Sequence, residues 1–203
     1  ALALAEAGAD IAALARSEPV DTLAQVRAAG RRCAWIDAEF GHAAPAADIV
    51  PRVVAALGGL HILINNAGTI RRNDALDFTE SEWDEVVDVN LKAAFFLAQQ
   101  AARHWVAKGG GGKIINIVSM LSFQGGIRVA SYTASKSGLL GITRGLANEW
   151  ARHGINVNAI APGYFATNNT DALRKDENRN RDILARIPAG RWGSPGDLGG
   201  AAV

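Results

Sequence analysis

The chain has 203 residues, of which 49% are hydrophobic and 20% are charged, and its formal net charge is +1. This length and balance fit one globular domain with a sizeable core, and a charge so close to zero gives no bulk attraction to nucleic acid or to an anionic membrane. The single cysteine, Cys33, excludes an internal disulfide and a cysteine-based metal site and fits a reducing cytosol.

Both ends of the sequence look cut. The alanine-rich start carries Glu6, Gly8 and Asp10 and lacks a basic leader, which is typical of the middle of a helix rather than of a signal peptide. The last residues, 199–203, stop inside an apolar run without a helix cap. No apolar run reaches the ~18 residues that a membrane span needs, so we expect a cytoplasmic protein.

Apolar runs alternate with helical patterns along the chain. In chain order, the patterns predict a helix over 1–8, a strand over 10–14, a helix over 20–29, a strand over 33–36, a helix over 46–57, a strand over 61–64, a helix over 81–107, a strand over 114–118, a helix over 132–152, a strand over 155–160, and loop with short helix over 164–190. Such alternation predicts βαβ units, hence a doubly wound α/β fold with a parallel sheet. No linker or repeat divides residues 1–203, so we expect a single domain.

Three residues carry the strongest chemical signal. Tyr132 and Lys136 are four positions apart, so on a helix they share a face. A free phenol titrates near ~10, which is too high for an efficient acid/base at neutral pH, and a neighbouring ammonium is expected to lower that pKa. Ser119 ends a predicted buried strand, where its hydroxyl can reach a substrate oxygen beyond the carboxyl ends of the strands.

Two further features lie close to these residues in the predicted topology. Asn90 falls between Val89 and Leu91 inside a predicted helix, where an amide competes with backbone hydrogen bonds and needs a reason. Residues 65–68, Asn-Asn-Ala-Gly, directly follow a predicted strand. Each feature alone is common on helix surfaces or at strand ends, but their combination in this order favours a catalytic site.

In this combination and order, the sequence resembles the short-chain dehydrogenase/reductase family. The resemblance implies a Rossmann-type fold and hydride transfer between a nicotinamide cofactor and a carbonyl or alcohol. It also implies that Tyr132 is the general acid/base and that Ser119 positions the reacting oxygen. Lys136 would bind the ribose hydroxyls and lower the tyrosine pKa, and Asn90 would hold a water that continues the proton relay to Lys136.

The same resemblance implies the cofactor site. The segment 65–68 would close a strand and support the cofactor, and the segment from Pro162 to Thr167 would lie beside the nicotinamide and the pyrophosphate. The implied cofactor contacts are Asn65, Ala67, Gly68, Tyr132, Lys136, Gly163 and Thr167. No metal is expected.

Two family features are absent from the sequence. Doubly wound dinucleotide folds begin with a strand and a glycine-rich turn that seats the pyrophosphate at a helix N-terminus; residues 1–8 look like the helix that follows that turn. The last family strand is absent as well. Because the first strand would lie in the middle of the sheet, we expect a gap or unpaired strand edges in its place.

The choice between NAD and NADP stays open. An acid at the end of the second family strand would bind the 2′-hydroxyl of NAD, whereas an arginine there would suit the 2′-phosphate of NADP. The acid is missing at Ala15, and Arg16 favours NADP, while the resemblance favours NAD. Near the adenine the family has an aspartate; here Glu39 takes that place, with Asp37 as an alternative.

The residues also favour a sugar acid as substrate. A polyhydroxy carboxylate needs a guanidinium for its carboxylate and amides for its hydroxyls. Three stretches, 119–136, 155–174 and 186–198, resemble family members that act on deoxy-keto sugar acids. The candidate substrate residues are Ser119, Arg71, Arg72, Gln124, Arg128, Tyr164, Asn168 and Asn169.

The helices predicted over 81–107 and 132–152 are apolar on more than one face, so each must bury a second face. We expect them to form a two-fold interface with another copy, within the homotetramer that the resemblance implies. Two alternatives to a sugar-acid dehydrogenase stay open. One is another reductase of the family, for gluconate or a 3-oxoacyl thioester; the other is a non-catalytic nucleotide-binding or assembly protein.

Overall fold

The structure is a computed structural model that describes residues 1–41 and 47–203. In these residues the strands are β1 (Ile11–Ala15), β2 (Cys33–Asp37), β3 (Ile62–Asn65), β4 (Gly112–Ile117) and β5 (Ile155–Ile160). They form two parallel sheets: β1 pairs with β2, and the larger sheet has the order β3-β4-β5. The parallel α/β architecture predicted from the sequence is therefore confirmed.

Helices connect the strands. They are α1 (Leu2–Glu6), α2 (Val20–Ala28), α3 (Ile49–Leu57), α4 (Glu80–Val87), α5 (Ala93–Ala107), α6 (Ala130–Trp150), α7 (Asp171–Lys175), α8 (Glu177–Leu184) and α9 (Gly199–Ala202). A π-helical segment, Asp88–Lys92, joins α4 to α5, and single 3₁₀ turns lie at Met120–Ser122, Ala151–His153, Asn168–Thr170 and Pro195–Leu198. Within 1–41 and 47–203, no helix combines the length and the apolar character that crossing a membrane requires.

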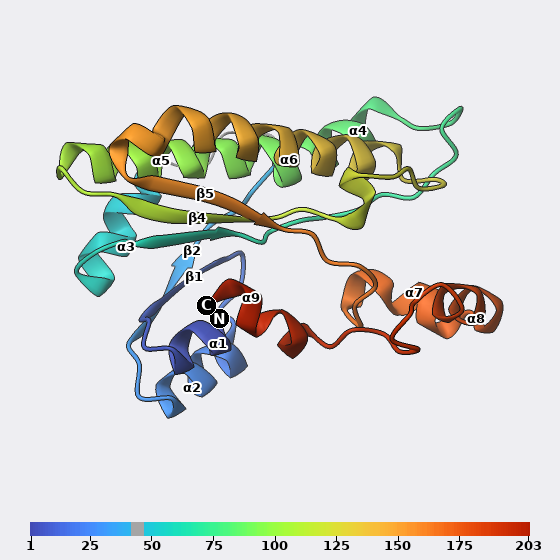
Figure 1. Cartoon of the computed structure of the whole chain (residues 1–203), viewed down its shortest axis with the longest axis horizontal. Helices are drawn as coiled ribbons and strands as arrows, with labels where there is room; N and C mark the ends of the chain where they lie inside the picture. The colour runs from blue at the N-terminus through green and yellow to red at the C-terminus, as the bar shows by residue number, and fades with distance from the viewer. Residues whose placement is uncertain (42–46) are drawn as a thin grey trace.

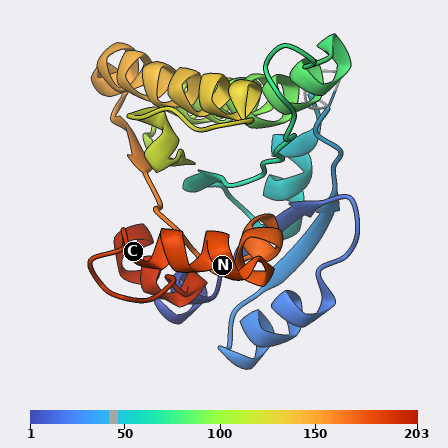
Figure 2. The same ribbon diagram turned by 90° about the vertical axis from the view of Figure 1, so that its right-hand side faces the viewer.

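The helices form layers around the larger sheet. In Figure 1, α4, α5 and α6 run along one face of this sheet, with α6 packed on β5 and α5 on β4. The α7–α8 segment projects from the other side of the molecule, and Figure 2 shows it well separated from α6. Helices α1 and α9 pack together, so the two ends of the chain lie side by side.

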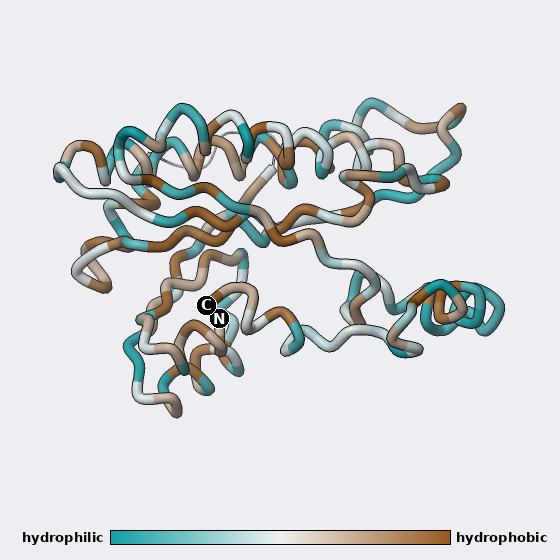
Figure 3. Tube along the Cα trace, in the orientation of Figure 1, coloured by the Kyte–Doolittle hydropathy of each residue, from teal (hydrophilic) through white to brown (hydrophobic). Residues whose placement is uncertain are grey.

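Apolar contacts, rather than a continuous ladder, join the two sheets. In Figure 3 the strands of the larger sheet are mostly hydrophobic, as expected for a buried sheet, and the exposed helix α8 is mostly hydrophilic. Leu14 of β1 and Leu63 of β3 pack against one buried cluster, formed by Ala38, Ile49 and Leu97. In the described residues β1 and β3 share no ladder, so the gap expected between these strands is present.

The predicted helix boundaries need two corrections. The pattern over 81–107 predicted one uninterrupted helix, but the chain forms a π turn at 88–92, in the segment that contains Asn90. The helix predicted over 46–57 begins at Ile49, and residue 46 lies outside the described residues. Apolar periodicity cannot detect the π turn, because one wider turn changes the helical register by only a single residue.

Gly112 gives a test of packing at the start of β4. A Cβ on this residue would lie 2.3 Å from the Trp105 ring, which is itself buried and donates a hydrogen bond from Nε1 to the Leu60 carbonyl. Gly112→Ala should therefore lower the free energy of unfolding by about 1–3 kcal/mol, as overpacked core sites do.

Gly141→Ala is the matched control, since a Cβ there meets nothing within 4 Å and alanine is favoured over glycine in a helix by roughly 0.5–1 kcal/mol. Urea unfolding followed by circular dichroism measures both variants. Equal midpoints for the two would contradict the packing argument.

Candidate active site

Ser119, Tyr132 and Lys136 meet beyond the carboxyl end of β4. Ser119 lies two residues after β4, and Tyr132 and Lys136 project from the first turns of α6. The Lys136 Nζ atom lies 5.8 Å from the centroid of the Tyr132 ring, so the two side chains share one face of the helix. The Tyr132 hydroxyl and Ser119 are joined by a side-chain hydrogen bond. This geometry suits an acid/base with a second hydroxyl beside it.

The pKa of Tyr132 is raised rather than lowered, so the sequence-based expectation was wrong in direction. Burial is the largest cause, because it disfavours the phenolate. The hydrogen bond with Ser119 and the charge of Arg72 both act in the opposite direction. Arg72 thus favours the phenolate, but as the smallest of the three causes, and burial outweighs it.

Lys136 is 4% exposed, and burial lowers its pKa to about 8. Its ammonium donates a 2.7 Å hydrogen bond to the Ile117 carbonyl at the end of β4. A Cβ on residue 68 would lie 3.6 Å from this Nζ and 3.3 Å from Asn90 Oδ1. Glycine at position 68 therefore leaves space beside the ammonium, which suits close approach of a ligand.

The Asn90 amide explains why a polar residue is buried in this helix. Its Oδ1 accepts a 2.8 Å hydrogen bond from the Thr69 N–H, and its Nδ2 donates to the Thr69 carbonyl and to Ser135 Oγ. Ser135 in turn donates to the Tyr132 carbonyl. Asn90, which is 1% exposed, thus links the loop after β3 to the helix that carries Tyr132.

A second buried polar network joins Asn65, Asn116 and Thr143. Asn65 Nδ2 donates to Asn116 Oδ1 and to the Ala94 carbonyl, and Asn116 Nδ2 donates to Thr143 Oγ1 on α6. These bonds tie the ends of β3 and β4 to both covering helices. Asn65 therefore acts inside the protein, while Asn66, Ala67 and Gly68 are exposed and face outward from the strand end.

The remaining cofactor candidates lie along the carboxyl ends of the strands, where dinucleotides bind in open α/β sheets. Arg16 follows β1 directly and is exposed, and Glu39 is exposed two residues beyond β2. The Gly163 segment follows β5, and the Pro162 carbonyl accepts a hydrogen bond from the Met120 N–H next to Ser119. The space beside Gly68 and the buried Lys136 ammonium fit the nicotinamide-ribose half of a cofactor; no glycine-rich turn for its pyrophosphate occurs in the described residues.

Each candidate arginine has a different partner. Arg71 makes a two-point contact with the Glu85 carboxylate, at 2.8 and 2.6 Å. The Arg128 Nε lies 3.3 Å from Asp74. Arg72 pairs with no carboxylate in the part of the chain that the structure describes: its Nη2 donates to the Asn169 carbonyl at 3.1 Å, and its charge acts on Tyr132. Of the three, Arg72 best fits a substrate carboxylate.

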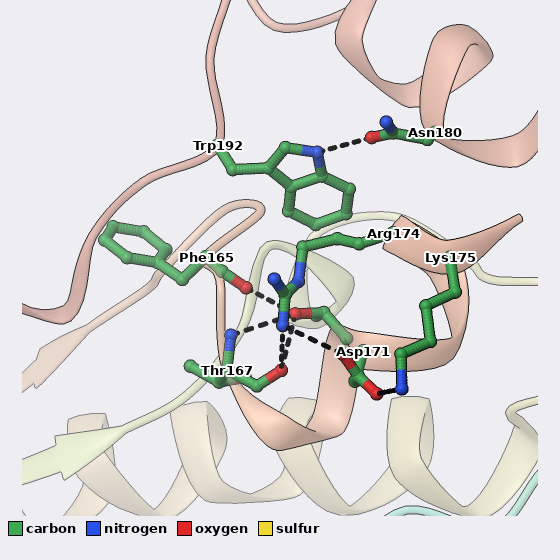
Figure 4. Close-up of polar contacts among 8 residues, drawn as sticks. Phe165, Thr167, Asp171, Arg174, Lys175, Asn180 and Trp192 are labelled. Carbon is green, nitrogen blue, oxygen red and sulfur yellow. Dashed lines mark hydrogen bonds and ion pairs between the residues drawn. The ribbon is translucent and has the colours of Figure 1, made fainter. Parts of the chain in front are cut away.

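The other substrate candidates lie on two sides of the site. Gln124 is exposed in the loop before α6, whereas Tyr164, Thr167 and Asn168 belong to the segment 164–193. This segment is held by its own contacts. In Figure 4, Arg174 reaches the Thr167 carbonyl and Asp171, and Trp192 donates to Asn180.

The Trp192 ring also packs edge-on against Tyr164, with 5.5 Å between ring centroids. Phe165 and Gly193 form a bridge at the base of the segment. The Arg72 hydrogen bond to Asn169 therefore joins two bodies, the loop after β3 and the segment 164–193. Among the described residues, Gln124 makes no hydrogen bond to the loop after β3 or to the segment 164–193.

Sequence reasoning missed four residues that organise the site. Ser135 and Thr69 hold Asn90, Asn116 holds Asn65, and Ser122 donates to the Lys136 carbonyl at 2.9 Å. The available signals were weak. Asn116 is a polar residue in an otherwise apolar strand, and Ser135 directly precedes Lys136.

The sequence matches a known protein family and a known enzyme over most or all of its length. The profile of the family described as short chain dehydrogenase matches residues 1–178. The 2-dehydro-3-deoxy-D-gluconate 5-dehydrogenase of Escherichia coli (strain K12) is 59% identical over 203 residues, which are 100% of this chain and 80% of that protein.

Solved structures agree with this match. One from Agrobacterium tumefaciens, assigned provisionally as a 2-deoxy-D-gluconate 3-dehydrogenase with bound NADP, is 52% identical with a TM-score of 0.89 over 99% of this chain and 80% of that one. A gluconate 5-dehydrogenase from Burkholderia cenocepacia J2315, in complex with NADP and tartrate, is 37% identical with a TM-score of 0.83 over 98% and 79%. The chain belongs to the short-chain dehydrogenase/reductase family.

Proposed function

We propose that the chain, as one catalytic domain, interconverts a secondary alcohol and a ketone on a deoxy-keto sugar acid of the 2-dehydro-3-deoxy-D-gluconate type, with NAD(P) as cofactor. The observation that carries the proposal is the guanidinium of Arg72. Its charge is the smallest of the three causes that act on the pKa of Tyr132, and it lowers that pKa. Its Nη2 also donates to the Asn169 carbonyl, and it pairs with no carboxylate in residues 1–41 and 47–203. A carboxylate bound there would hold the substrate beside the acid/base.

The proposed mechanism uses the chain's own residues for proton transfer. In the oxidation, the Tyr132 phenolate takes the proton of the substrate hydroxyl, while the Ser119 hydroxyl donates to the same oxygen. The bound nicotinamide would supply the acceptor for the hydride. The ribose of the cofactor would lie in the space beside Gly68, where the Lys136 ammonium would bind its hydroxyls. Asn90 holds the loop after β3 and α6 at a fixed separation.

The name of the Escherichia coli relative supports this substrate class, and the resemblance of the loops between the catalytic positions agrees with it. The Burkholderia structure with tartrate shows that a family member of similar fold holds a hydroxylated carboxylate, which keeps gluconate as a second candidate. An intact set of Asn90, Ser119, Tyr132 and Lys136 argues against a purely non-catalytic role. The lone, free Cys33 supports a cytoplasmic location.

The proposed cofactor preference is NADP. Arg16 is exposed directly after β1, in position for a 2′-phosphate, and NADP is bound in the Agrobacterium and Burkholderia structures. The exposed Glu39 remains a candidate for the adenine end.

We also propose a homo-oligomer, a tetramer by the family resemblance, through α5 and α6. A groove of about 460 Å³ runs between the outer faces of these helices, lined by Phe95, Leu146 and Trp150 among others. Arg103 and Glu149 also line it, so a two-fold partner would bring opposite charges together.

Substrate and mechanism are tested by one assay. The wild-type protein should oxidise sugar acids faster than it turns over a 3-oxoacyl thioester, and Tyr132→Phe should lower the turnover number ~100- to 10,000-fold because the acid/base hydroxyl is lost. Circular dichroism checks that the fold persists. More than a tenth of wild-type activity in the variant would reject Tyr132 as the acid/base.

Arg72→Ala should weaken sugar-acid binding by about 1.5–3 kcal/mol, the range for a lost charged hydrogen bond. It should also shift the pH profile of oxidation to higher pH, because the Arg72 charge lowers the pKa of Tyr132. Steady-state kinetics across pH measures both effects. Arg71→Ala is the control: its guanidinium is occupied by Glu85, so an equal loss there would contradict the assignment.

Lys136 should make stability depend on pH in the cofactor-free protein. Its pKa is about 8 in the folded state and higher when unfolded, so burial of the ammonium is unfavourable below pH 8. Between pH 8 and ~10.4 the unfolded chain binds more protons, so the free energy of unfolding should rise by roughly 3 kcal/mol relative to Lys136→Met. Urea unfolding at pH 7 and pH 10 measures this; parallel curves for the two proteins would count against the buried ammonium.

Light scattering tests the oligomer. Trp150→Glu places a charge in the groove and should reduce the assembly to a smaller species, because an unpaired buried charge destabilises an interface. Val20→Glu is the control, since Val20 is 61% exposed and lies on α2, away from the groove. Wild-type protein that is monomeric at micromolar concentration would sink the proposal.

A further inference from the structure

Arg128 has an unusual backbone conformation for its residue type. Within residues 1–41 and 47–203 it is the single non-glycine residue with a positive φ, at 64°. Such a conformation is unfavourable for a residue with a Cβ, and it persists only where the surroundings hold it. Strain of this kind at the edge of a site points to a role in the arrangement of that site.

Two contacts hold Arg128 against the loop that carries Arg72. The Asn73 N–H donates a 3.1 Å hydrogen bond to the Arg128 carbonyl, and the Arg128 Nε lies 3.3 Å from Asp74 Oδ1. The two residues that follow Arg72 in the chain are thus both fixed by Arg128. Asn73 in turn holds the rest of the loop and the start of α4, because its Nδ2 donates to the Asp77 carbonyl and to Glu82.

Arg128 is fixed equally firmly to the acid/base. Val129 next to it is buried and is the N-cap of α6, and its carbonyl accepts the Thr133 N–H at 2.9 Å. Tyr132 lies in this first turn of α6. Arg128 therefore connects the loop of Arg72 to the first turn of the helix that carries Tyr132, in addition to the link through Asn90.

We propose that Arg128 is a positioning residue that sets the distance between the carboxylate anchor at Arg72 and the acid/base at Tyr132, and so selects which carbon of a sugar acid reacts. The inference rests on the proposed function, because it takes Arg72 as the carboxylate anchor. The left-handed backbone of Arg128 and the hydrogen bond that its carbonyl accepts from Asn73 are the main features that set this distance. The ion pair with Asp74 is exposed on both sides and contributes little by itself.

The test compares substitutions that keep or disrupt the turn. Arg128→Gly keeps the left-handed conformation and the carbonyl, whereas a β-branched residue in Arg128→Val disfavours that conformation strongly. Ile127→Val is the control, because Ile127 is 84% exposed and has no positive φ. The substrates are 2-dehydro-3-deoxy-D-gluconate and 2-deoxy-D-gluconate. The names of the matched relatives place the reacting carbon at position 5 of the first and position 3 of the second.

Arg128→Val should change the ratio of the kcat/KM values for these two acids on the order of tenfold, through misplacement of the reacting carbon, while the KM for NADP stays at its wild-type value. Arg128→Gly should change the ratio less, and Ile127→Val should not change it. An unchanged ratio in Arg128→Val, or an equal loss for both acids together with a changed cofactor KM, would overturn the proposal.

A second measurement does not depend on catalysis. Amide hydrogen exchange should become faster in residues 70–78 of Arg128→Val, because the Asn73 N–H loses its acceptor, and should stay close to wild type in Arg128→Gly. If exchange in this loop is the same in both variants, Arg128 does not position Arg72. If the loop responds as expected but wild-type protein turns over no sugar acid, the proposed function fails, and the selection of a carbon fails with it.

Discussion

The site depends on the two-sided hydrogen bonding of one buried amide. Asn90 binds both the N–H and the carbonyl of Thr69 and also Ser135 on α6. An amide buried without these partners would be strongly unfavourable, so the loop after β3 and the first turns of α6 must keep their relative positions. Tyr132 and Lys136 lie on these turns of α6, so their positions relative to the loop are fixed as well. The π turn at 88–92 belongs to the same arrangement, since it places the Asn90 side chain where both partners are within reach.

Burial and charge act in opposite directions on the acid/base. Burial raises the pKa of Tyr132 and lowers the pKa of Lys136 to about 8. A buried lysine near its titration point is a weak source of positive potential at alkaline pH. Arg72 stays charged throughout, so in the cofactor-free protein it is the dependable cation beside the phenol. In the proposed function, one guanidinium would therefore serve both substrate recognition and the tuning of the phenol pKa.

The sequence predicted the fold to within one or two residues at most strands, because apolar runs and glycine stops are local signals. Helical spacing also placed Tyr132 and Lys136 on one face of a helix, and the family resemblance joined Ser119 to them. It could not predict which cation acts on the phenol. That depends on the path of the loop after β3, whose contacts with Arg128 and Asn169 join residues more than fifty positions apart. Periodicity carries no information on such contacts.

The three arginines show the same limit at the level of single side chains. From the sequence, Arg71 and Arg72 after a strand end and Arg128 between Ser119 and Tyr132 were equivalent candidates. In the structure, Glu85 pairs with Arg71 and Asp74 pairs with Arg128, whereas among the described residues Arg72 bonds to a backbone carbonyl, that of Asn169. A guanidinium has five N–H donors, and Arg72 uses one on the Asn169 carbonyl, so most of its hydrogen-bonding capacity is left for a ligand. Of the three candidate arginines, the acids beside Arg71 and Arg128 thus leave Arg72 as the one on which the proposed carboxylate would meet a guanidinium without a competing acid in the described residues.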